Sequence, residues 1–189
     1  MKIVGGIFKN KKLFIPIDKK TRPLRQIVKE SIFNIIDHSK KINLNINGSN
    51  VLDLFSGSGS FGLECISRRA KKVFFFENYP NAIEILQKNL KSLKNIKNYE
   101  IIKDDCFRFF DSDEVFEFKF DLIFIDPPYK DRKISMLLKK IYDSDILFEN
   151  SLIILHRHKN VNDEIPDKFK ILETKRYGIS KLIFLTLKS

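Results

Sequence analysis

The 189-residue sequence contains only two cysteines, Cys65 and Cys106, which lie far apart. They form no C-x-x-C pair, which argues against a disulfide framework or a zinc knuckle and favours a reducing compartment. No apolar run approaches the roughly 20 residues that a membrane-spanning helix needs. The first residues also lack the apolar core of a signal peptide. We therefore expect a soluble cytoplasmic protein without a membrane partner.

Acidic residues are scarce in the first quarter of the chain. Residues 1–49 hold 11 Lys and Arg against 3 Asp and Glu, whereas residues 50–189 hold 24 against 21. A general drift toward lysine would spread the excess evenly along the chain. The asymmetry therefore favours a polyanion contact near the N-terminus, with nucleic acid preferred over membrane. Its candidate contacts are Lys9, Lys11 and Lys12.

The basic region predicts a short extension, residues 1–46, ahead of a main domain, residues 47–189. Residues 2–17 alternate loosely between polar and apolar side chains and predict a small hairpin or two short strands. Thr21 is expected to cap a helix that has Pro23 in its first turn. The apolar residues of that helix fall on one face. They are Val28, Ile32, Ile35 and Ile36.

From residue 51 onward, strands alternate with helices. Strands are expected at residues 51–55, 73–77, 99–103, 120–126, 151–156, 169–177 and 181–187. Helices are expected from the glycine-rich turn through about residue 69, over residues 80–94 and around residues 133–142. Continuous apolar strands between helices predict a parallel sheet covered on both faces. The short link before the last strand favours an antiparallel final pair.

The segment DLFSGSGSFG follows the first expected strand and begins at Asp53. Gly57, Gly59 and Gly62 satisfy the G-x-G-x-x-G pattern, and Glu77 ends the next strand. This fingerprint alone fits NAD or S-adenosylmethionine, because both carry ribose hydroxyls that a carboxylate can bind. Asp53 favours S-adenosylmethionine, since its carboxylate would repel a pyrophosphate and attract a sulfonium or an ammonium. Its simpler role would be to cap the turn or the helix.

Asp104, Asp105 and Cys106 follow the third expected strand. Asp105 is placed to meet an adenine amine, either by its side chain or through the adjacent amide of Cys106. Asp104 could equally be a solvated strand end. We do not expect Cys106 to be a nucleophile, because no histidine lies nearby in the sequence and its context is the exit of a strand.

The segment FIDPPYK ends the fourth expected strand with a carboxylate, two prolines and an aromatic ring. Asp126 can accept one N–H of an exocyclic base amine and the carbonyl of Pro127 the other, which orients the amine and enriches its nitrogen in electrons. Pro127 and Pro128 fix φ and add no competing N–H donor. Tyr129 offers a face on which a base can stack. Unless it is only a strand-terminating turn, the segment predicts a clamp for in-line methyl transfer.

Several segments resemble the bacterial methyltransferases that modify guanine N2 in 16S ribosomal RNA, the RsmD type. They are RPLRQIVKESIFNII, VLDLFSGSGSFGLECISRRA, FFFEN, DCFRFF, FDLIFIDPPYK and RYG, and the similarity covers nearly the whole chain. The resemblance implies the α/β class I fold of S-adenosylmethionine-dependent methyltransferases. This Rossmann-like fold has a seven-stranded, mostly parallel sheet with the last strand antiparallel, here with a short N-terminal hairpin and helix extension.

The same resemblance implies a role for each candidate residue. S-adenosylmethionine would be bound by Asp53, Phe55, Ser56, Gly57, Gly59, Glu77, Asn78, Asp105 and Cys106. The target guanine would be held by Asp126, Pro127, Pro128 and Tyr129. Arg22, with Arg25 nearby, would help to present the RNA. The implied partner is 16S ribosomal RNA or the small ribosomal subunit, and a single domain of this size can act as a monomer.

Two positions depart from the family pattern. Leu24 stands where the family usually has Thr, and His156 stands where it usually has Glu at the tip of the fifth strand. His156 changes the local charge. A metal site with His158 is not expected, since no third ligand is apparent.

Three other functions stay open on sequence grounds. An adenine-N6 methyltransferase of DNA or RNA could use the same clamp. An NAD-dependent oxidoreductase would fit the glycines but leave the D-P-P-Y segment unexplained. A non-catalytic RNA-binding factor would explain the charge and leave the clamp idle.

Overall fold

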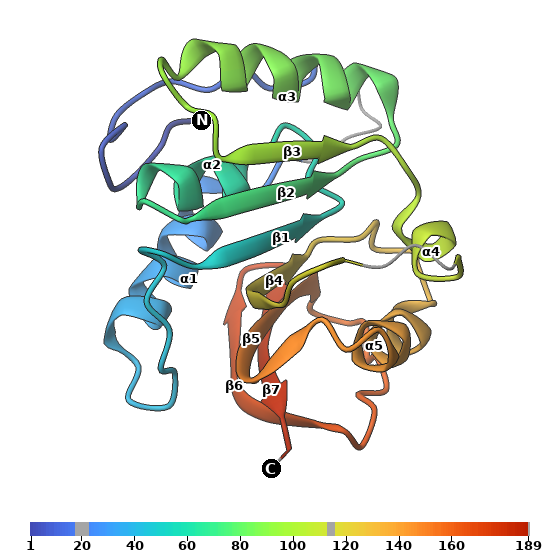
Figure 1. The fold of residues 1–189 in the computed structure, drawn as a ribbon. Helices are drawn as coiled ribbons and strands as arrows, with labels where there is room; N and C mark the ends of the chain where they lie inside the picture. The colour runs from blue at the N-terminus through green and yellow to red at the C-terminus, as the bar shows by residue number, and fades with distance from the viewer. Residues whose placement is uncertain (18–22, 113–115, 189) are drawn as a thin grey trace.

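The computed structural model describes residues 1–17, 23–112 and 116–188. Its centre is a seven-stranded sheet in the order β3-β2-β1-β4-β5-β7-β6, in which β7 runs antiparallel to both of its neighbours (Figure 1). The strands are β1 Asn50–Leu54, β2 Lys72–Phe76, β3 Tyr99–Ile102, β4 Phe120–Ile125, β5 Leu147–His158, β6 Phe169–Tyr177 and β7 Ser180–Leu187. The predicted fold class is confirmed, and only β5 extends by more than one residue beyond its predicted bounds.

The described residues form five helices, which cover both faces of the sheet. They are α1 Gln26–His38, α2 Ser60–Ser67, α3 Pro80–Ser92, α4 Cys106–Phe109 and α5 Ile134–Asp143. Side chains alternate between the faces along each strand. Val51 of β1 therefore packs in the core formed with α1, α2 and α3, whereas Leu52 packs in the core formed with α4 and α5. Figure 1 shows α4 and α5 together at one side of the molecule.

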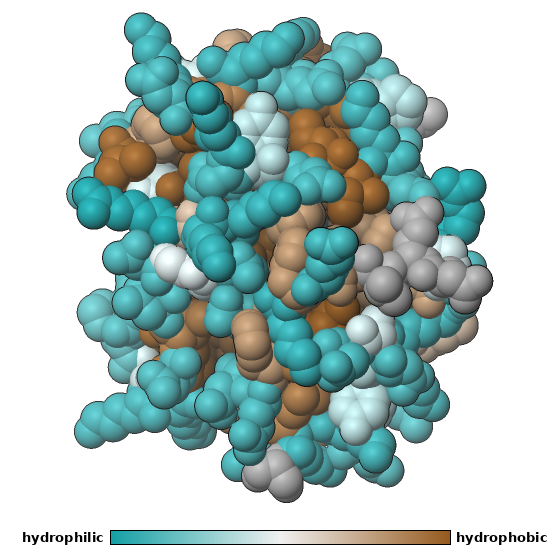
Figure 2. All heavy atoms as spheres, viewed as in Figure 1, coloured by the Kyte–Doolittle hydropathy of each residue, from teal (hydrophilic) through white to brown (hydrophobic). Residues whose placement is uncertain are grey.

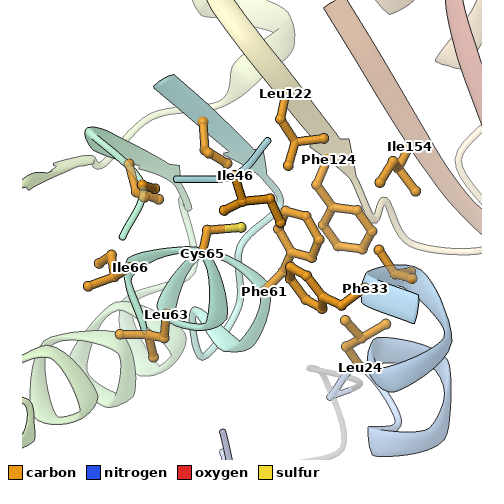
Figure 3. Close-up of a cluster of buried hydrophobic side chains, with 14 of the residues drawn as sticks. Leu24, Phe33, Ile46, Phe61, Leu63, Cys65, Ile66, Leu122, Phe124 and Ile154 are labelled. Carbon is orange, nitrogen blue, oxygen red and sulfur yellow. The ribbon is translucent and has the colours of Figure 1, made fainter. Parts of the chain in front are cut away.

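Three aromatic rings join the N-terminal helix to the sheet. Phe61 of α2 lies between Phe33 of α1 and Phe124 of β4, with ring centroids 5.3 Å and 4.1 Å away (Figure 3). Gly62 follows in the chain, and a Cβ there would lie 2.3 Å from the ring of Phe75. The third glycine of the fingerprint is therefore required for close packing of the helix on the sheet.

The N-terminal extension differs in two ways from its prediction. Helix α1 begins at Gln26 with Arg25 as its N-cap, so Pro23 precedes the helix and the predicted cap at Thr21 is wrong. Thr21 itself lies outside the described residues. The backbone of Arg25 is extended, at φ −60° and ψ 138°, and Leu24 before it is buried in the core. Residues 2–17 form one antiparallel bridge rather than regular strands.

Strands β4 and β5 begin in one register and finish in another. Their pairing jumps from Phe120 with Leu147 to Leu122 with Leu152, which makes a bulge in β5. The hydroxyl of Ser151 closes the bulge by donating to the carbonyl of Phe120 at 2.6 Å. Beyond this point the pairing is regular up to Ile125 with Leu155, which is the carboxyl end of β4.

The surface is mainly polar. In the view of Figure 2, hydrophilic side chains cover most of the face, and apolar side chains appear as patches between them. Of the helices within the described residues, none combines the length and the apolar character that crossing a bilayer requires.

Candidate active site

A cavity of about 470 Å³ opens at the carboxyl ends of the central strands. Six residues predicted to bind the cofactor line it: Asp53, Phe55, Ser56, Gly57, Glu77 and Asn78. All four residues of the predicted clamp line it too, as does Arg25. The structure therefore brings the glycine turn and the D-P-P-Y segment, which are far apart in the sequence, into one cavity.

Glu77 holds the glycine turn in place. One oxygen of its carboxylate accepts from the backbone N–H of Gly57 at 2.7 Å, and the other accepts from Asn78 and Tyr79 at 3.0 Å and 2.9 Å. Gly57 has a φ of 56°, which favours glycine. A carboxylate can accept about four hydrogen bonds, so Glu77 keeps capacity for a ligand hydroxyl.

Gly59 does not line the cavity, although it was predicted to bind the cofactor. It has a φ of 77°, and a Cβ there would lie 2.3 Å from Leu86 of α3. Its N–H donates to the carbonyl of Ser56 at 2.8 Å. The second glycine is thus required by the turn and by the approach of α3.

Asp53 is a buried acid at the tip of β1. Its carboxylate accepts from the backbone N–H of Gly62 at 2.9 Å, so it does cap α2 while it also lines the cavity. Burial raises its pKa well above the usual range, the charges of Asp126 and Glu77 raise the pKa further, and the Gly62 N–H acts in the opposite direction. Three carboxyl groups that line one cavity create a site suited to a cationic group.

Asp105 reaches the cavity through another residue. One of its oxygens caps α4 by accepting from Phe107 at 2.8 Å and from Arg108 at 3.3 Å, and the other accepts from the amide of Asn78 at 3.2 Å. The prediction missed this short helix, although an Asp directly before it is a typical N-cap. Cys106 is therefore the first residue of a helix rather than the exit of a strand. Burial raises the pKa of its thiol far above the usual range, which disfavours a nucleophilic role.

Asp126, which directly follows β4, contacts His156 of the neighbouring strand β5, which extends to His158. The regular end of the β4–β5 pairing sets the two residues side by side, and Oδ1 of Asp126 lies 2.7 Å from Nδ1 of His156. The ring of Tyr129 packs edge-on to the rings of His156 and His158, with centroids 6.1 Å and 5.2 Å away. The sequence singled out His156 only as a departure from a pattern, because this contact depends on the strand register.

Arg157 holds the turn of the predicted clamp through hydrogen bonds, a role that the sequence did not predict. It is fully buried and donates to both carboxylate oxygens of Asp163 at 2.8 Å and 3.0 Å. Its remaining bonds go to the carbonyls of Pro128 at 3.1 Å and Asp131 at 2.6 Å. One guanidinium thus fixes the turn that carries the clamp. The available signal was a lone arginine directly after the apolar run of β5, between His156 and His158.

Four buried polar atoms of the described residues have no hydrogen-bond partner. They are the hydroxyl oxygens of Ser56, Ser60 and Ser180 and the Nε2 atom of His156. All four residues line the cavity. Because buried polar groups in native proteins are nearly always paired, this cluster indicates the place of a polar ligand.

The N-terminal extension forms part of the cavity wall and is attached by a buried ion pair. Nζ of Lys29 lies 3.3 Å from Glu64, whose carboxylate accepts from the backbone N–H groups of Val4 and Gly5 at 2.8 Å and 2.7 Å. Lys29 also donates to the carbonyl of Lys2 at 2.8 Å. Burial lowers the pKa of Lys29, and the charge of Glu64 opposes that shift.

The RNA contacts predicted on the extension lie outside the cavity lining, apart from Arg25. Lys9, Lys11 and Lys12 are exposed, and the turn before them contacts the C-terminal end of α2, where the N–H of Ile7 donates to the carbonyl of Ser67 at 2.8 Å. Arg22 lies outside the described residues.

The sheet order, the glycine turn and the acids at the strand tips define the class of S-adenosylmethionine-dependent methyltransferases. Residues 1–186 match the model of the family described as "Conserved hypothetical protein 95", and the chain belongs to this family. The Bacillus subtilis protein YlbH is 34% identical over 167 residues, which cover 88% of this chain and 86% of that protein. "Ribosomal RNA small subunit methyltransferase D" of Haemophilus influenzae is 31% identical over 180 residues, which cover 95% of this chain and 90% of that protein.

Solved structures agree with this assignment. The crystal structure of Haemophilus influenzae HI0767 has a TM-score of 0.79 at 28% identity, and the match covers 100% of this chain and 99% of that one. The Escherichia coli protein yhhF has a TM-score of 0.83 at 24% identity, and the match covers 100% of this chain and 98% of that one. At 24% identity, the likeness to yhhF is evidence for the fold alone.

The residues present fit S-adenosylmethionine, the cofactor of this enzyme. Its cationic groups suit the three acids, and its ribose and amino acid groups suit the serine hydroxyls that lack partners. The choice of S-adenosylmethionine over NAD is confirmed by the relatives, which are methyltransferases. Within residues 1–17, 23–112 and 116–188, no group of three or more His, Cys, Asp or Glu side chains is arranged to hold a metal ion.

Proposed function

We propose that this methyltransferase modifies the exocyclic N2 of a guanine in the 16S RNA of the small ribosomal subunit. Support comes from relatives such as the Haemophilus influenzae protein, whose name specifies ribosomal RNA of the small subunit. The observation that carries the proposal is the shared cavity, which presents the acids around Asp53 and the clamp at Asp126 to the same space. The protein is expected to act as a monomer in the cytoplasm.

S-adenosylmethionine supplies an electrophilic methyl group on a sulfonium. The protein must then orient a poor nucleophile, since the lone pair of a base amine is delocalised into the ring. Asp126 accepts an N–H of the amine, and Tyr129 provides a ring against which the base packs. Arg157 keeps the turn between them rigid through the carbonyls of Pro128 and Asp131. Holding the reacting atoms in this way supplies most of the rate.

The RNA reaches the cavity from the side of the N-terminal extension. Arg25 lies at the cavity wall, and Lys9, Lys11 and Lys12 are exposed on the same N-terminal extension. Backbone phosphates would contact these side chains without reading the sequence. Guanine N2 is hard to attack in line within a duplex, so the target base is flipped out or already unpaired.

The decisive experiment is transfer of a tritiated methyl group into ribosomal RNA from an undermethylated strain, followed by nucleoside analysis. We expect N2-methylguanosine in the 16S RNA. N6-methyladenosine as the product would overturn the proposal in favour of the adenine enzyme that could use the same clamp. RNA binding without any methyl transfer would favour a non-catalytic factor.

A further inference from the structure

His156 is held in an unusual state for a buried histidine. It is 5% exposed, lines the cavity, and contacts Asp126 through Nδ1 at 2.7 Å. Its other ring nitrogen, Nε2, is buried and has no partner among the described residues. The ring is therefore fixed on one side and unsatisfied on the other.

The contact with Asp126 determines which nitrogen carries the proton. An ionised carboxylate only accepts hydrogen bonds, so Nδ1 of His156 must donate its N–H to Asp126. A neutral imidazole in this tautomer has its lone pair on Nε2. A buried acceptor without a donor costs free energy. A ligand that brings an N–H group into the cavity would recover that cost.

We propose that His156 is the proton acceptor of the methyl transfer, an inference that rests on the proposed function. The lone pair of the amine nitrogen forms the new bond to the methyl carbon, while the carbon–sulfur bond breaks and leaves its electron pair on sulfur. The nitrogen then carries a positive charge and one proton too many. That proton passes to Nε2, which leaves a neutral methylated amine and an imidazolium. Asp126 stabilises the imidazolium through Nδ1, as carboxylates do for other histidine bases.

The test compares His156 with a second histidine that packs on the same tyrosine. The variants are His156→Ala, His156→Asn and His158→Ala, assayed for methyl transfer to ribosomal RNA in single turnovers with and without added imidazole. His158 does not line the cavity, and its Nδ1 accepts from the backbone N–H of Asn160 at 3.2 Å. Calorimetry with S-adenosylmethionine checks that each variant retains its cofactor site.

We expect His156→Ala to lower the transfer rate about 100-fold, as loss of a general base does, with cofactor affinity unchanged. Imidazole should restore part of that rate with saturation, because it supplies the missing base in the space left by the side chain. His156→Asn keeps an N–H that can reach Asp126 but has no basic nitrogen, so it should be as slow as His156→Ala. His158→Ala should keep the wild-type rate and should not respond to imidazole.

Two results would overturn the inference. An unchanged rate in His156→Ala would do so, and so would wild-type activity in His156→Asn, because the side chain would then serve only to hold Asp126. A readout independent of activity is the nitrogen NMR spectrum of the ¹⁵N-histidine-labelled protein. We expect neutral His156 with its proton on Nδ1, and a proton on Nε2 would contradict the inference. If the wild type made a different methylated nucleoside, the proposed function would fail while the NMR result still judged His156.

Discussion

Two buried polar clusters in this protein differ in whether their hydrogen-bonding groups have partners within the protein. Around Lys29 and Glu64, the ion pair is completed by backbone groups of the N-terminal extension. Around Asp126 and His156, one ring nitrogen and three nearby hydroxyls have no partner among the described residues. The first cluster is satisfied by the protein itself and holds two parts of the fold together. The second is completed only by a ligand, which distinguishes a binding site from a structural one.

Removing the central acid of the incomplete cluster should have the largest effect. We expect Asp126→Ala to lower methyl transfer to ribosomal RNA by about 1,000-fold or more, because the amine is no longer oriented and the proton acceptor loses its partner. Calorimetry should show that S-adenosylmethionine still binds. Asp121→Asn is the matched control, since Asp121 lies at the opposite end of β4 and accepts from the N–H of Asn50. Full activity of Asp126→Ala would remove the clamp from the mechanism.

Breaking the completed cluster should affect folding instead. Lys29→Met leaves Glu64 buried without its principal cation, which should lower the free energy of unfolding by about 3 kcal/mol. Urea denaturation measures this change, with Lys12→Met as an exposed control that should shift stability little. Below the unfolding transition, cofactor affinity should match that of the wild type. A loss of cofactor binding in the folded variant would show that the two clusters are not separate.

Arg157 shares a property with each cluster. Its hydrogen bonds are all made within the protein, yet two of them hold the turn that carries the predicted clamp. Arg157→Lys keeps a charge beside Asp163 but cannot reach the carbonyls of Pro128 and Asp131 together. We expect transfer to fall about 30-fold with cofactor affinity retained, since misplacement of the clamp costs rate before binding. Arg176→Lys on exposed β6 is the control. Equal activity of the two variants would show that the brace is dispensable.

The exposed lysines of the extension should show the smallest effect. Replacing Lys9, Lys11 and Lys12 with glutamine is expected to weaken RNA binding about tenfold and to reduce the salt dependence of log K by about 2. Stability should not change, because none of the three side chains joins the buried pair. A control that removes exposed lysines elsewhere, Lys139 of α5 and Lys170 of β6, should leave the salt dependence as it is. An unchanged slope in the first variant would remove these lysines from the interface.

The sheet and the acids of the site could be predicted because their signals are local. Apolar runs between helical segments gave the strands, and the glycine turn with Asp53 and the D-P-P-Y segment marked where two strands end. Parallel strands bring their carboxyl ends to one edge, so the meeting of these segments follows from fold class.

The contacts of His156 and Arg157 could not be predicted in the same way. They depend on a register between β4 and β5 that shifts at a bulge, and on whether a charged side chain is buried. The start of α1 was mispredicted because the burial of Leu24 and the extended backbone before Gln26 override the local preference for a cap at Thr21. Tertiary packing determines the strand register, the burial of a charged side chain and the start of this helix, and short stretches of sequence carry little information about it.

The bulge in β5 has a consequence for how relatives of this chain can diverge. It lies at the end of the strand remote from the cavity, where residues 148–150 are exposed. Insertions or deletions there can be taken up by the surface, while the Ser151 bond to Phe120 restarts the pairing at the same place. Length variation at this bulge should therefore be neutral for catalysis, whereas a single residue gained between Ser151 and His156 would turn the histidine to the other face of the sheet.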